Sequence, residues 1–174
     1  RDCDVLGARV SPKGKVLDKK SISIAAAPRT QAMPDVAAND NGFVVVWHGF
    51  QNDEANAKGF ARRVGPNGAM GETVAGVCGA NPKIAWNGRE HLVVYTHGGS
   101  RGGTGISQEK GCRRLDTAGK PLAKPSGVSG LYIQGYVRYS ICGVPGGKGW
   151  VIVTHSGPPN YWGRTIGIQL AYSV

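Results

Sequence analysis

The stretch that decides the fold is Gly42-Phe-Val-Val-Val-Trp-His48, because two other segments of the chain repeat it. Leu92-Val-Val-Tyr-Thr-His97 and Trp150-Val-Ile-Val-Thr-His155 have the same order of an aromatic residue or Leu, several β-formers and a final histidine. A half-buried strand alternates apolar with polar residues, whereas here both alternating sets are apolar. We therefore expect three strands that are buried on both faces, inside a sandwich or between stacked sheets.

The composition favours a single all-β domain. The chain has 174 residues with 28 glycines and 10 prolines, and no long segment has the 3.6-residue period of a helix. A chain of this length can bury a sizeable core as one domain. No run of 18 or more apolar residues occurs, so a membrane span is not expected.

The cysteines and the start of the sequence favour an exported protein, secreted or periplasmic. The four cysteines are even in number and never spaced as Cys-x-x-Cys, which argues against a zinc site and leaves up to two disulfides open, with no pairing preferred. The sequence starts at Arg1 without Met and without a signal-peptide pattern, which indicates a processed or trimmed product. The disulfide candidates are Cys3, Cys78, Cys112 and Cys142.

The charge is strongly basic, with a formal net value of +10 from 21 Lys and Arg against 11 Asp and Glu. A basic surface attracts nucleic acid, anionic polysaccharide or acidic lipid. The basic residues are scattered without a block of five, so a role in solubility alone fits equally well. Nucleic acid is disfavoured as a partner, because aromatic and basic residues do not interleave along one strand.

A period of about fifty residues extends the repetition through the chain. Val10, Val64, Leu115 and Leu170 each end a related short motif, and they follow one another at intervals of 54, 51 and 55 residues. A glycine lies four residues after each of the first three. Because glycine adopts positive φ without a Cβ penalty, this position predicts a tight turn in every copy.

Each repeat predicts four antiparallel strands. One strand leaves the glycine turn, a second begins near a proline or tyrosine, the apolar strand follows a Gly/Asn turn, and a fourth carries the Arg-rich motif. Four antiparallel strands in about fifty residues, repeated in series, are typical of propeller blades. We therefore expect one domain, 1–174, with blade-like repeats at about 11–64, 65–115 and 116–172, and an additional strand, 4–10, from a preceding blade.

Three segments, from the second repeat and the start of the third, resemble a known group of repeats. They are Pro82-Lys-Ile-Ala-Trp-Asn-Gly88, His91-Leu-Val-Val-Tyr-Thr96 and Cys112-Arg-Arg-Leu-Asp-Thr-Ala-Gly-Lys-Pro-Leu122. They are similar to the β-propeller repeats, about fifty residues long, of many exported bacterial proteins, which typically read VAWNG…YLVVW and GQRLD…G.PL. The resemblance covers almost the whole chain and implies a fold but no particular activity. The chain departs from the group after the third strand, where the group often has an acidic residue and this sequence has His.

Three repeats are fewer than the four to eight blades usual in a propeller. The repeats could belong to a longer propeller, could be completed by a second copy or another subunit, or could form an open three-repeat fold. We favour completion by more chain or by a partner, because exposed strand edges with unpaired N–H and C=O groups promote aggregation.

Three aligned histidines, His48, His97 and His155, end the apolar strands. In a propeller they would lie on one face, where three neutral imidazoles could hold zinc or copper, or one imidazole could act as a general base. The favoured interpretation is structural, with each ring closing a turn through its nitrogens. His91 is expected in a solvated turn.

The third repeat contains aromatic and basic residues that the other two copies lack. Duplication cannot explain features of one copy, so a ligand site is predicted here, with aromatic rings for sugars or bases and arginines for an anionic group. Packing of these aromatic residues on an edge or a missing neighbour is an equal alternative. The residues are Tyr132, Tyr136, Arg138, Tyr161, Trp162 and Arg164.

The sequence favours a non-catalytic binding or assembly module that recognises a carbohydrate or anionic ligand or docks a partner. No nucleophile elbow, phosphate loop or calcium loop supports catalysis or nucleotide binding. The alternative is a hydrolase or lyase that uses the three histidines with Tyr136 or Tyr161, with or without a metal. A structural subunit of a larger complex is a third hypothesis. The sequence does not indicate any particular cofactor.

Overall fold

The structure is a computed structural model that describes residues 2–50, 58–96, 110–122, 126–127, 138–156 and 165–172. For residues 110, 126–127, 138, 154–156 and 165–172 only the backbone is described.

All regular elements in these residues are β-strands, which confirms the all-β prediction. The described part of the chain contains no helix that could cross a membrane. The strands are β1 (Val5–Gly7), β2 (Ile22–Ala25), β3 (Gln31–Asn39), β4 (Gly42–Gly49), β5 (Lys58–Val64), β6 (Met70–Ala75), β7 (Ala80–Trp86), β8 (His91–Thr96), β9 (Lys110–Leu115), β10 (Ser126–Gly127), β11 (Arg138–Val144), β12 (Gly149–Ser156) and β13 (Thr165–Tyr172).

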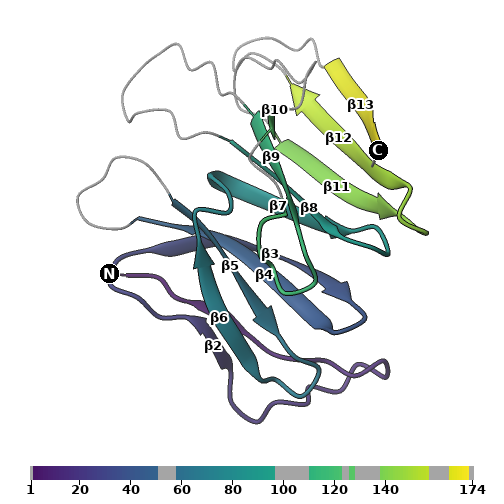
Figure 1. Cartoon of the computed structure of the whole chain (residues 1–174). Coiled ribbons are helices and arrows are strands. Elements are labelled where there is room, and N and C mark those ends of the chain that lie inside the picture. The colour runs from purple at the N-terminus through teal and green to yellow at the C-terminus, as the bar shows by residue number, and fades with distance from the viewer. Residues whose placement is uncertain are drawn as a thin grey trace.

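The strands form four antiparallel sheets in which neighbours in sequence are neighbours in space. Their orders are β1-β2, β3-β4-β5-β6, β7-β8-β9-β10 and β11-β12-β13. Figure 1 shows them following one another from the purple N-terminal strands to the yellow C-terminal strands. None of the sheets formed by the described strands closes on itself.

Three hairpins, β1–β2, β5–β6 and β9–β10, turn in the same way. Gly14, Gly68 and Gly119 have φ of 78°, 85° and 84°, which confirms the turn predicted from the glycine spacing. In each turn the glycine N–H donates a hydrogen bond to the carbonyl three residues earlier, over 2.9 to 3.1 Å. The three turns are therefore structurally equivalent.

A β-bulge at one position shows that β3 and β7 are equivalent too. Met33 and Asn81 each precede a proline and have φ of 50° and 51°. The strand register shifts at both places, between Ala32 and Asp35 and between Ala80 and Lys83. The bulge occurs in both sheets, so residues of β3 and β7 can be compared position by position.

Successive sheets pack face to face, which explains why the apolar strands carry no polar face. In β4, Val45 and Trp47 pack toward β1–β2, whereas Val44 and Val46 pack toward β7–β10. All six residues of β8 are buried. Burial on both faces is therefore confirmed for β4 and β8.

The third copy, β12, differs from this expectation. Ile152 is fully buried against the sheet before it, but Val153 on the opposite face is 40% exposed. The prediction of burial on both faces is wrong for this strand, because no described residues cover the far side of β11–β13.

Candidate docking groove

The structure places His48 in a structural position. The side chain is 7% exposed, and Nδ1 accepts a hydrogen bond from the Asn81 backbone N–H over 3.2 Å. Burial lowers the pKa of His48, so the neutral ring that can accept this bond is favoured. His48 thus joins β4 to the start of β7.

The strand register does not align His48 with His97. His48 pairs with Ala32, and the equivalent partner Ala80 pairs with Thr96. His97 lies outside the described residues, and for His155 only the backbone position in β12 is described. In the described part of the chain no group of three His, Cys, Asp or Glu side chains is placed to hold a metal ion.

The solvated position expected for His91 is wrong. His91 is fully buried at the start of β8, where Nδ1 lies 3.0 Å from the Asp116 carbonyl and Nε2 lies 3.4 Å from Asn39 Nδ2. Its ring packs on Trp86 with centroids 4.7 Å apart. The Gly-Arg turn before it suggested exposure, but the neighbouring sheet covers the ring. Burial lowers the pKa of His91.

The predicted ligand platform lies largely outside the described residues. This holds for Tyr132, Tyr136, Tyr161, Trp162 and Arg164. Arg138 begins β11, and only its backbone is described. The hypothesis of an aromatic and basic site in the third repeat stays a prediction.

The expected disulfides are not present, since Cys3, Cys78, Cys112 and Cys142 are free thiols. Cys78 packs in the cluster between the second and third sheets, whereas Cys112 packs in the cluster between the third and fourth. A whole sheet therefore separates the two cysteines that contribute to the core. Cys3 and Cys142 are exposed. Burial raises the pKa of Cys78 to about 12, which keeps this thiol protonated and unreactive.

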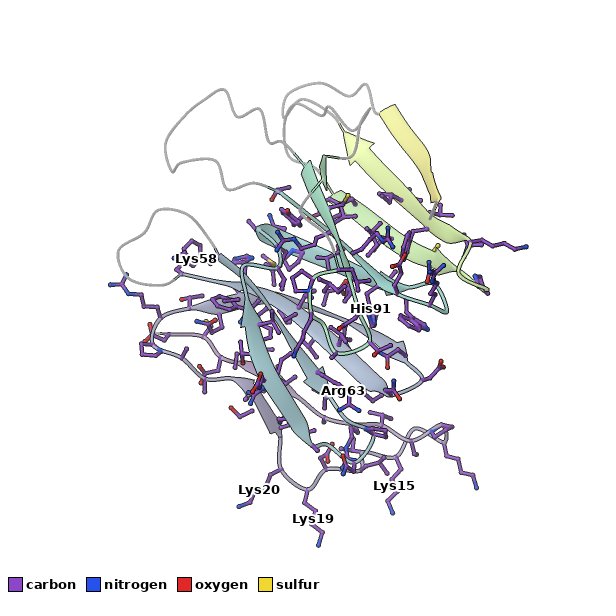
Figure 2. The ribbon with its side chains drawn as sticks, in the orientation of Figure 1. Lys15, Lys19, Lys20, Lys58, Arg63 and His91 are labelled. Atoms are coloured by element: carbon purple, nitrogen blue, oxygen red, sulfur yellow. The ribbon has the colours of Figure 1, made fainter. Side chains whose placement is uncertain are left out.

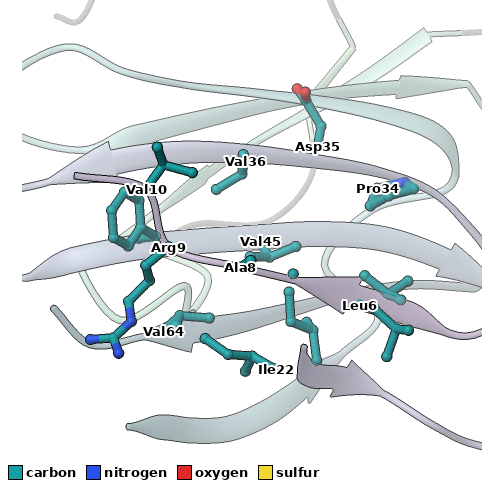
Figure 3. Close-up of a pocket in the computed structure, with 14 residues that line it drawn as sticks. Leu6, Ala8, Arg9, Val10, Ile22, Pro34, Asp35, Val36, Val45 and Val64 are labelled. Carbon is teal, nitrogen blue, oxygen red and sulfur yellow. The ribbon is translucent and has the colours of Figure 1, made fainter. Parts of the chain in front are cut away.

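A groove near the N-terminus is the best-formed candidate site. It has a volume of about 470 Å³ and lies between the segment 5–10, which contains β1, and the face of the sheet β3–β6. Pro34 and Val36 of β3 and Phe43 and Val45 of β4 line its floor. Figure 3 shows Val36, Val45 and Val64 on strands that pass beneath this segment. The lining is mainly apolar, which suits protein side chains or an apolar ligand.

Equivalent positions show that this floor is a face normally covered by another sheet. Val36 pairs with Val45 in one sheet as Ile84 pairs with Val93 in the next. Ile84 is 4% exposed because β3 and β4 lie over β7, whereas Val36 is 55% exposed. The prolines at equivalent positions show the same difference in exposure, since Pro82 of β7 is fully buried and Pro34 of β3 is exposed.

The edge of β1 bordering the groove is available for strand pairing. β1 is equivalent to β5 and β9 by its hairpin turn, and those strands pair on both sides, with β4 and β6 or with β8 and β10. Among the described strands β1 pairs only with β2. An added strand would therefore find backbone N–H and C=O groups beside an apolar floor.

Charged contacts hold the hairpin β1–β2 in place above the groove. The Arg9 guanidinium binds the Asp18 carboxylate through Nε and Nη2 at 2.5 to 3.1 Å, and Nη1 donates to the Pro66 carbonyl over 2.7 Å. Hydrogen bonds from Arg9 lower the pKa of Asp18. On the opposite face of β3, the Asp35 carboxylate accepts the Ile84 backbone N–H and lies 3.6 Å from Lys83 Nζ, which joins β3 to β7. The groove therefore has an anchored wall.

Comparisons of the chain with protein-family models, curated proteins and solved structures gave no match. The lining of the groove offers apolar side chains and backbone groups. Sequence reasoning missed this site. The signal that could have found it is Val36, which occupies in the first repeat the position that Ile84 occupies in the second.

Proposed function

We propose that this chain is a non-catalytic binding and assembly module of an exported β-propeller protein, and that its groove docks β-strands from further chain of the same protein, from another polypeptide or from a second copy. Serial antiparallel sheets that stack face to face and repeat the same hairpin support the propeller part of the proposal. Recognition of a carbohydrate or anionic ligand by the third repeat is part of the same proposal.

The observation that carries the docking proposal is the exposure of Val36, 55%, against 4% for its equivalent Ile84. The strands that cover Ile84 are β3 and β4, and residues of β4 such as Val46 reach toward β7. The occupant should therefore be a pair of antiparallel strands of the β3–β4 type. One strand would pair with the edge of β1, and its apolar side chains would cover Val36 and Pro34.

The exposed area is consistent with a protein partner. Leu6, Val10, Met33 and Val36 are each between 55% and 61% exposed, although they are large apolar residues. They lie on β1, its extension and β3, at the same end of the stack. Contiguous exposed apolar surface of this kind marks an interaction site more often than a free surface.

A labelled peptide with the sequence of residues 31–49 provides the experimental test. Fluorescence anisotropy should show saturable binding of this peptide to the protein, and Val36→Glu should weaken binding at least tenfold because a carboxylate would be buried. Val153→Glu is the matched control, since Val153 is also exposed but lies at the other end of the stack. A peptide that does not bind, or binds Val36→Glu as well as the parent, would contradict the docking function.

A further inference from the structure

The turns of the hairpins β1–β2 and β5–β6 differ sharply in charge, whereas the turn after β9 keeps one lysine, Lys120, at the position of Lys15. The turn of β1–β2 carries Lys13, Lys15, Lys19 and Lys20 within eight residues. In the turn of β5–β6 the positions of Lys13 and Lys15 hold Asn67 and Ala69, and Glu72 is the only charged residue among residues 65–74. Lys19 and Lys20 lie in a bend before β2, where β5–β6 already continues as strand. Because the turn backbone is the same, the fold does not require Lys13 or Lys15.

The lysines are available for contacts outside the chain. All four are exposed, and among the described residues none of them forms an ion pair. The nearby carboxylate of Asp18 is already bound by Arg9. Figure 2 shows Lys15, Lys19 and Lys20 extending from the lower edge of the molecule, away from the core.

Two apolar side chains lie between the lysines on the same turn. Val16 is 56% exposed and Leu17 is 51% exposed, and neither lines the docking groove. Lysines beside exposed apolar residues suit a surface that offers negative charge and a hydrocarbon layer together. A soluble polyanion would use only the charge.

We propose that hairpin residues 11–20 form a binding site for an anionic lipid surface, with the four lysines at the headgroups and Val16 and Leu17 inserted below them. This inference goes beyond the docking function and does not rest on the groove. The Arg9–Asp18 pair supports the site by holding the hairpin rigid while leaving the lysines free.

The test measures cosedimentation of the protein with vesicles of phosphatidylglycerol and phosphatidylcholine, with pure phosphatidylcholine vesicles as the reference. Binding should require phosphatidylglycerol and weaken with salt. The triple variant Lys13→Asn, Lys15→Ala, Lys19→Thr should bind about a hundredfold more weakly, at roughly fivefold for each lysine. Lys13→Asn and Lys15→Ala copy the turn of β5–β6, and Lys19 is exposed in a bend, so thermal unfolding of the variant should match that of the parent.

Leu17→Ser separates a lipid surface from a soluble polyanion. Partitioning into the anionic vesicles should fall several-fold without a change in its salt dependence, whereas binding to dextran sulfate should not change. Two results would overturn the proposal. The first is that the triple variant binds vesicles as the parent does; the second is that Leu17→Ser leaves vesicle binding intact while dextran sulfate binds as tightly as the vesicles.

Discussion

The strands β3 and β7 are built alike and are covered differently. Both begin with a bulge at positive φ before a proline, and both pair with an apolar strand in the same register. Yet Ile84 is 4% exposed and Val36 is 55% exposed. The strand itself is therefore the same unit in both places, and its stability depends on the sheet stacked against it. Where no described strands cover that face, the equivalent side chain Val36 is exposed.

The largest difference in stability between the covered face of β7–β8 and the exposed face of β3 is expected when a charged side chain is introduced. Val93→Asp places a carboxylate where the side chain is fully buried between two sheets, so it should destabilise the fold by at least about 4 kcal/mol and prevent folding. Val36→Asp should leave the isolated chain folded. Far-UV circular dichroism and urea titration measure both. If Val36→Asp unfolds the chain as well, the floor of the groove is part of the core.

A smaller difference is expected for truncation at the two equivalent positions. Ile84→Ala removes buried methyl groups and should lower the free energy of unfolding by about 2–5 kcal/mol. Val36→Ala should change it by less than about 0.5 kcal/mol, because the side chain already contacts water. Parallel denaturant titrations provide the comparison. Similar losses for the two variants would show that Val36 is covered within the isolated chain.

The smallest expected effect is a pH dependence of the free energy of unfolding, caused by the buried His91. Burial lowers the folded-state pKa of His91, so the unfolded chain binds more protons and stability falls as the pH drops below the unfolded value of about 6.5. His91→Phe, which copies the equivalent residue Phe43, should reduce this slope and leave a remainder from His48, whose pKa is lowered in the same direction. Thermal unfolding between pH 5 and 8 gives the slope. An unchanged slope in the variant would mean that His91 is not held neutral.

The sequence predicted the parts of the fold that depend on local chemistry. The glycine at each turn was predictable because positive φ strongly favours glycine there, and burial of β4 and β8 followed from their two apolar faces. Burial of β12 was overestimated, because a composition suited to burial does not show whether a neighbouring sheet is present.

The candidate site was less predictable, because it depends on stacking between sheets. The environment of His91 is formed by Asn39 and Asp116, which are 52 and 25 residues away in sequence. The separation of Cys78 from Cys112 likewise follows from which face of a sheet each one occupies. The sequence alignment made His97 the equivalent of His48, whereas the strand pairing makes Thr96 the equivalent. This difference of one residue matters because neighbouring residues of a strand point to opposite faces of the sheet.

Amide hydrogen exchange on the protein with and without the hairpin peptide of residues 31–49 tests the docking groove most directly. We expect the peptide to slow exchange in β1 and around Val36, while β11–β13 exchanges at the same rate as before. Unchanged exchange in β1, or protection confined to the edge of β13, would contradict the claim that this groove receives strands.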